Sequence, residues 1–253
     1  MTIEYTPSVV TLEGKIASVS NYYGLIIGID SYDDETIQDL DHPIRDAEKM
    51  YNSLTENYLF NHFNTRLLKN PTREEIINEF DYLAEIVTPV DNVLIFYAGH
   101  GDYDEKTEIG YWLPSNGTNE SKAKWLRNST LIDYFELINS KHTLLISDAC
   151  FAGTIFKSRS RNMEVDNAFE RIYDKRSRKA MTSASNTEVS DKSEFIKYLI
   201  LTLNENDETY LSARMLFDDI YMSVASNSKS LPLYNTIQNV GDEGGDFIFL
   251  RRK

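Results

Sequence analysis

Short apolar runs alternate along the chain with segments of helical spacing. Residues 22–30 and 92–97 are almost continuously apolar, which is typical of strands buried on both faces of a parallel sheet. Between them, the segment 43–57 repeats apolar residues at helical spacing, and Pro43 suits the first turn of that helix. The alternation predicts an α/β fold with a mostly parallel sheet covered by helices on both faces.

The same patterns predict the remaining elements. Thr72 followed by Glu75 forms a capping box, which predicts the start of a second helix. Residues 1–21 show no clear periodicity and are expected to form an N-terminal arm, and 102–126 and 154–178 are expected to be irregular loops. Further strands are predicted at 63–68, 142–147, 179–184 and 245–250, and further helices at 72–87, 129–139, 195–203 and 213–224.

The charge balance and the cysteine count exclude several classes of protein. Asp and Glu number 40 against 26 Lys and Arg, and this net charge of -14 disfavours binding to nucleic acid or to anionic membranes. The chain shows no membrane-spanning apolar run and no secretory signal at its start, so a cytoplasmic protein is expected. A single cysteine rules out an internal disulfide and a four-thiolate zinc site.

Two of the predicted strands end in reactive side chains. His100 follows the strand at 92–97, and Cys150 follows the strand at 142–147. The carboxyl ends of parallel strands meet at one edge of a sheet, so neighbouring strands would bring the two side chains together. An imidazole beside a thiol favours the nucleophilic thiolate. Either residue alone fits a buried cysteine or a surface histidine, but the pair in this context favours a catalytic site.

These residues carry a family resemblance. The segments 97–101 and 147–153 resemble the paired His and Cys motifs of the caspase-like cysteine peptidases, most closely the prokaryotic and metacaspase-type members. The resemblance implies a three-layer α/β/α sandwich around a sheet of about six strands. Resembling segments at 23–30, 40–50, 179–184 and 244–249 extend the likeness over about 22–250, with a large part at about 22–156, a linker at about 157–178 and a small part at about 179–253.

The resemblance also implies roles for individual residues. Cys150 would attack the scissile carbonyl, and His100 would protonate the leaving amine and later activate water. The backbone N–H groups of Gly101 and Cys150 would form the oxyanion hole, which stabilises the charge that develops in the transition state. The family requires no third catalytic side chain, and the sequence offers no obvious one.

Two acidic residues stand where the resemblance places a substrate pocket. Asp148 and Asp46 together would bind a basic side chain, Arg bidentately, which implies cleavage after Arg or Lys. Alternatively, Asp148 could cap a following helix, and Asp46 could lie in a solvated first turn. Arg45, if it turned inward, would neutralise the pocket. Pro43 stands where metacaspases often carry Cys, which alters the pocket wall but leaves the acidic pair intact.

Basic residues crowd the segment between the two predicted parts. An Arg/Lys-specific peptidase would cut such an exposed loop in itself, although a merely solvated loop has the same composition. The candidates for self-cleavage are Arg159, Arg161, Lys175, Arg176 and Arg178.

The sequence itself calls for no cofactor or metal. Calcium is the one metal for which two clusters of acids offer oxygen ligands, although neither matches a helix–loop–helix calcium signature and solvated loop acids explain them as well. The clusters comprise Asp30, Asp33, Asp34 and Glu35, and Asp102, Asp104 and Glu105.

The leading interpretation is an endopeptidase that acts on protein substrates and is controlled by a separate regulator protein, by a metal or by self-cleavage. The resemblance suggests a setting in bacterial stress, cell death or antiviral defence. The alternatives are a non-catalytic caspase-like binding module and another hydrolase or transferase that uses the same Cys and His pair.

Overall fold

A central sheet of six strands organises the chain in the computed structural model, which describes residues 20–149, 168–183 and 192–252. The strand order is β10-β8-β7-β3-β1-β2, and every strand is parallel to its neighbours except β10, which is antiparallel to β8. The strands are β1 (Tyr22–Gly28), β2 (Thr65–Lys69), β3 (Asn92–Ala98), β7 (His142–Asp148), β8 (Ser177–Thr182) and β10 (Leu233–Thr236). The predicted mostly parallel sheet is confirmed.

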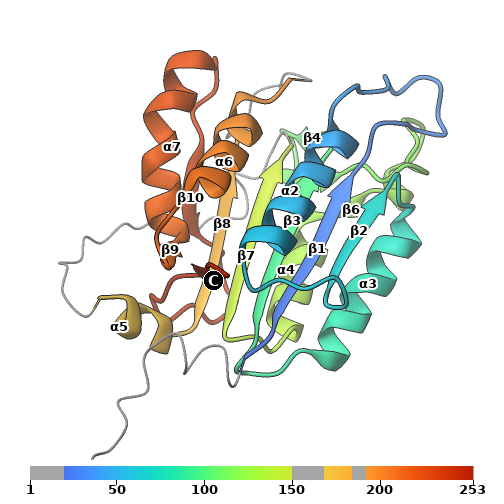
Figure 1. The fold of residues 1–253 in the computed structure, drawn as a ribbon. Helices are drawn as coiled ribbons and strands as arrows, with labels where there is room; N and C mark the ends of the chain where they lie inside the picture. Colours follow the sequence, from blue (N-terminus) through green and yellow to red (C-terminus); the bar gives the residue numbers. More distant parts are fainter. Residues whose placement is uncertain (1–19, 150–167, 184–191, 253) are drawn as a thin grey trace, which may run out of the picture.

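Helices cover both faces of this sheet and make three layers (Figure 1). Helices α2, α6 and α7 pack on one face in a single apolar core with alternate residues of the strands, and α3 and α4 pack on the other face in a second core. None of the described helices is long and apolar enough to cross a membrane. The helices are α2 (Pro43–Asn57), α3 (Arg73–Ile86), α4 (Asn128–Leu137), α5 (Ala168–Asp174), α6 (Glu194–Glu205) and α7 (Ala213–Asn227), with a short 3₁₀ helix η1 (Lys122–Lys124).

Local sequence signals set the start of two helices. Pro43 occupies the first turn of α2, and Gly28 lets that turn approach the end of β1, because a Cβ there would lie 2.7 Å from the carbonyl oxygen of Pro43. The capping box of α3 forms as predicted, with the Thr72 hydroxyl accepting from the Glu75 N–H and the Glu75 carboxylate accepting from the Thr72 N–H. The close approach at Gly28 places the amino end of α2 beside the carboxyl end of β1.

The segment after β3 corrects one expectation. It was predicted to be irregular, but much of it forms a small antiparallel sheet of β4 (Gly101–Asp104), β5 (Ile109–Trp112) and β6 (Leu126–Arg127). Trp112 is 3% exposed and stacks on Tyr97 with ring centroids 4.1 Å apart, and Trp125 is 7% exposed. Both tryptophans therefore pack this sheet onto the body of the protein.

The C-terminal third of the chain differs from two further expectations. Residues 168–178 are not part of a continuous loop, because α5 occupies 168–174 and β8 begins at Ser177. The last strand, β11 (Ile248–Leu250), pairs with the unpredicted strand β9 (Tyr210–Ser212) rather than joining the central sheet. The sixth strand of that sheet is β10, which the sequence pattern missed.

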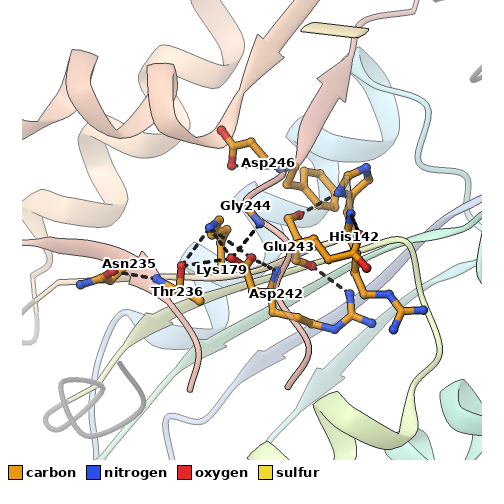
Figure 2. A network of polar contacts seen from close by, with 12 residues as sticks. His142, Lys179, Asn235, Thr236, Asp242, Glu243, Gly244 and Asp246 are labelled. Atoms are coloured by element: carbon orange, nitrogen blue, oxygen red, sulfur yellow. Dashed lines mark hydrogen bonds and ion pairs between the residues drawn. The ribbon is translucent and has the colours of Figure 1, made fainter. Parts of the chain in front are cut away.

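Asp242 joins the loop before β11 to the start of β8 (Figure 2). Its carboxylate accepts from the Arg178 and Gly244 N–H groups at 2.8 and 3.1 Å, and it pairs with the Lys179 ammonium at 3.1 Å. Lys179 also donates to the Thr236 hydroxyl of β10 at 2.9 Å. One carboxylate thus binds β8, β10 and the C-terminal loop together at the edge of the sheet opposite the strand ends that carry His100 and Asp148.

His142, also drawn in Figure 2, is buried beneath the same edge and has no exposed surface. Its Nε2 lies 3.0 Å from the Tyr173 carbonyl oxygen, which only accepts, so Nε2 carries the proton, and Nδ1 accepts from the Ser177 hydroxyl at 2.8 Å. The pKa of His142 is lowered to about 3, chiefly by burial and also by the cationic Lys141 and Arg178 nearby, against the opposing effect of the Tyr173 carbonyl.

His142 should therefore make the folded state sensitive to acid. The unfolded chain binds its proton near pH 6.5, so this contribution to the free energy of unfolding is complete above that pH and is lost as the pH falls toward 3. By pH 5 the loss is about 2 kcal/mol, at about 1.4 kcal/mol for each pH unit. Asp148 and Asp246 have raised pKa values, so they stabilise the folded state as the pH falls. The contribution of His142 is therefore isolated by comparing wild type with a variant that lacks this side chain.

Urea unfolding at pH 7.5 and pH 5 measures this contribution. Between pH 7.5 and pH 5, the free energy of unfolding should fall by about 2 kcal/mol more in wild type than in His142→Asn. His62→Asn is the matched control for the loss of an imidazole, because His62 is exposed and bonds to Tyr51. An identical pH dependence in wild type and His142→Asn would contradict the assignment.

Candidate active site

Strands β3 and β7 are neighbours in the sheet, as the predicted site requires. Their register places Ala98 beside Asp148, so both strands end at one level of the same edge, about 4.8 Å apart. His100 follows Ala98 by two residues, and Cys150 follows Asp148 by two residues. Cys150 itself lies outside the described residues, so the structure gives the surroundings of His100 and Asp148 and leaves the thiol as a prediction.

Two tyrosine hydroxyls hold the backbone of His100. The His100 N–H donates to the Tyr32 hydroxyl at 2.8 Å, and the Tyr97 hydroxyl donates to the His100 carbonyl at 2.7 Å. Burial raises the pKa of Tyr32 well above its usual range, so this hydroxyl stays neutral. Gly99 makes room for the arrangement, because a Cβ there would lie 3.1 Å from the Tyr97 hydroxyl and 3.3 Å from that of Tyr32.

A backbone carbonyl orients the imidazole ring. Nε2 of His100 lies 2.7 Å from the carbonyl oxygen of Gln38, which only accepts, so Nε2 carries the proton of the neutral ring and Nδ1 is the basic nitrogen. The ring also lies against Tyr32, with centroids 5.1 Å apart. A base whose second nitrogen is fixed by a third group is the usual arrangement around an activated nucleophile.

Sequence reasoning missed both of these partners of His100. The Gln38 carbonyl leaves no trace in side-chain identity, and Tyr32 follows β1 in a segment that carries no recognisable motif.

Gly101, the predicted oxyanion donor, begins β4 opposite Trp112. The Leu113 N–H donates to the His100 carbonyl at 3.1 Å, so His100 and Leu113, the pair next to Gly101 and Trp112, are joined by a backbone hydrogen bond between the two strands. Bonded and non-bonded pairs alternate in an antiparallel ladder, which makes Gly101 and Trp112 a non-bonded pair. The Gly101 N–H therefore points away from β5, as a donor to a substrate oxygen would have to do.

Asp148 ends β7 as a buried carboxyl group. It is 9% exposed, and its Oδ1 accepts no hydrogen bond from the described residues. Its pKa is raised to about 6, chiefly by burial and also by the charge of Asp46, against the lowering effect of the neighbouring hydroxyls of Ser183 and Ser193. These two serines, at the end of β8 and the cap of α6, were not predicted as part of the site.

Asp46 lies in the first turn of α2 and faces the same region. It is 9% exposed rather than solvated, and its charge acts on Asp148, so the structure brings the two predicted pocket acids together. Its Oδ1 pairs with the Lys49 ammonium at 3.0 Å. Arg45 is exposed, so the cation that contacts Asp46 is Lys49, which was not predicted.

The self-cleavage candidates fall into different surroundings. Arg159 and Arg161 lie outside the described residues, Lys175 is exposed, and Arg176 is half-buried with a hydrogen bond of 3.1 Å to Asn139. The prediction of Arg178 as a cleavage site is wrong, because this residue belongs to β8 and is only 1% exposed.

The guanidinium of Arg178 has a structural role instead. It donates to the carbonyl oxygens of Ser177 and Ser140, each at 2.8 Å, and burial lowers its pKa to about 10. A peptidase needs an extended, accessible segment, so Arg178 is withdrawn as a cleavage site.

The two acidic clusters do not assemble into an ion site in the described part of the chain, where no three His, Cys, Asp or Glu side chains are grouped to hold a metal. Asp102 and Asp104 share the Lys122 ammonium at 3.0 and 3.4 Å, and Asp34 accepts from Thr36 and Asn119. These acids stabilise the loops that carry them.

Comparison with known proteins agrees with this architecture. Residues 23–239 match the caspase domain family of C14 peptidases, whereas no curated protein matches the sequence significantly. The fold is similar to protein GSU0716 from Geobacter sulfurreducens (TM-score 0.61, 15% identity, 90% of this chain and 99% of that one). It is also similar to caspase-1 from Spodoptera frugiperda (TM-score 0.62, 15% identity, 87% and 89%), which confirms the predicted sandwich. The match over most of its length shows that the chain belongs to the caspase domain family.

Proposed function

We propose that this protein is a cysteine endopeptidase that cleaves after Arg or Lys, with Cys150 as nucleophile and His100 as acid and base. The observation that supports it most is the pair of buried carboxyl groups, Asp46 and Asp148, at the sheet edge where β3 delivers His100. A basic substrate side chain would supply Asp148 with a positive charge, while the only cation paired with Asp46 among the described residues is the half-exposed Lys49.

The proposed reaction has two halves, formation of a thioester and its hydrolysis, and Cys150 and His100 act in both. The Cys150 thiolate adds to the scissile carbonyl carbon, and the Gly101 N–H donates to the oxygen as it becomes negative. The C–N bond then breaks, and the leaving amine takes a proton from the His100 imidazolium, which leaves a thioester. Water attacks the thioester while His100 accepts its proton, and the C–S bond breaks to release a carboxylic acid and to restore the thiolate and the imidazolium.

The surroundings of His100 suit this cycle. The Gln38 carbonyl keeps the proton of the neutral ring on Nε2, so Nδ1 is the nitrogen that gains and loses the transferred proton. The two tyrosines fix the peptide from which the ring extends, which limits the ring's movement between the two steps.

Reporter peptides that differ only at the residue before the cut test the proposal. Purified protein should cleave reporters with Arg or Lys there and leave the Asp reporter uncut, because an acidic side chain would add a third negative charge to the pocket. Cys150→Ala should abolish cleavage. Equal turnover by that variant, or preferred cleavage after Asp, would overturn the proposal.

A further inference from the structure

Lys49 forms an ion pair with Asp46, one of the two carboxyl groups of the proposed pocket. Its ammonium lies 3.0 Å from the Asp46 Oδ1, one turn along α2, and its side chain is 51% exposed while that of Asp46 is 13% exposed. The second carboxyl group, Asp148, is 9% exposed and has an Oδ1 without a hydrogen-bond partner among the described residues. One of the two proposed pocket acids is therefore already paired, with a cation that lies half in solvent.

We propose that Lys49 is an internal competitor that holds Asp46 until a basic substrate side chain displaces it, an inference that rests on the proposed function. An ammonium on a flexible stem, half in water, loses little when it leaves one carboxylate. An incoming guanidinium can contact both Asp46 and Asp148, which the Lys49 ammonium does not. Lys49 thus raises the substrate concentration that the enzyme needs, and it shields the acids when the pocket is empty.

Removing this competitor should improve substrate binding without changing the chemistry. In Lys49→Gln we expect the KM for the Arg and Lys reporters to fall about two- to fivefold, the range set by the strength of a half-exposed ion pair, with kcat unchanged. A reporter with citrulline, the uncharged isostere of Arg, should keep its KM, because it does not compete for the carboxylate. Lys49→Arg restores a cation and should return the KM for the Arg reporter to the wild-type value.

Lys197 provides a matched control. It pairs with Glu194 at 2.7 Å with the same spacing of three residues, on the surface of α6, and it is 52% exposed. Lys197→Gln should leave KM and kcat for every reporter unchanged, and thermal unfolding of both Gln variants should match wild type.

The outcomes separate this inference from the function on which it rests. A KM for the Arg reporter that stays the same or rises in Lys49→Gln, while cleavage still depends on Cys150, overturns the role of Lys49 and leaves the peptidase proposal standing. A fall in KM of equal size for the citrulline reporter also overturns it, because the effect would then not be one of charge. Absence of Arg cleavage in both wild type and variant overturns the proposed function itself.

Discussion

Replacing His100 with glutamine is expected to lower kcat/KM for the Arg reporter by about 10³-fold, the scale of a lost general acid and base. Glutamine keeps a polar side chain of similar length and can still donate to the Gln38 carbonyl, but it does not exchange a proton near neutral pH. The leaving amine would then depart unprotonated, and the thiol would lose the base that makes it a thiolate.

The single cysteine of the chain makes the second consequence directly measurable. Alkylation of Cys150 at pH 7 reports its thiolate fraction without interference from other thiols, and His100→Gln should slow it. His62→Gln is the matched control, because His62 bonds to Tyr51 at an exposed position and should retain both activity and alkylation rate. Wild-type turnover by His100→Gln would exclude His100 from catalysis.

The sequence pattern predicted the centre of this fold better than its margins. Strands β1, β3 and β7 are buried on both faces, so each is an uninterrupted apolar run that stands out from its neighbours. Strands β9 and β10 have three and four residues, and β10 is half-buried along its length. Their pairing is decided by partners far away in the chain, and no local pattern carries that information.

The candidate site likewise contains residues that the sequence predicted and partners that it did not. His100 was predicted because an imidazole follows a buried strand, and Asp46 and Asp148 were predicted because the family resemblance places pocket acids at those positions. The Gln38 carbonyl and the Tyr32 hydroxyl were missed, because they act through positions that only the folded chain creates.

Arg178 was misplaced for the converse reason. A charged residue in a basic segment is typical of an exposed loop, yet backbone carbonyl oxygens here compensate its burial.

Asp148→Asn should produce the second large effect, a fall of about 100-fold in kcat/KM for the Arg reporter. The substitution keeps the shape of a side chain that is 9% exposed but removes its charge-assisted bond to the substrate cation, a loss of about 3 kcal/mol. The citrulline reporter should lose far less. Asp219→Asn, at an exposed position on α7, is the matched control and should change neither reporter.

The pH dependence of the same reporters isolates the ionisation of Asp148. Burial and the charge of Asp46 raise its pKa to about 6, so the carboxyl group is ionised at pH 7 and largely protonated at pH 5. The ratio of kcat/KM for Arg to that for citrulline should therefore fall about tenfold over this interval. Ionisation of the catalytic dyad affects both reporters alike and cancels in the ratio.

In Asp148→Asn this ratio should be low and nearly independent of pH. A wild-type ratio that stays constant from pH 7 to pH 5 would mean that Asp148 does not contact the substrate cation. In that case the specificity would have to come from Asp46, and Asp46→Asn would show the larger loss.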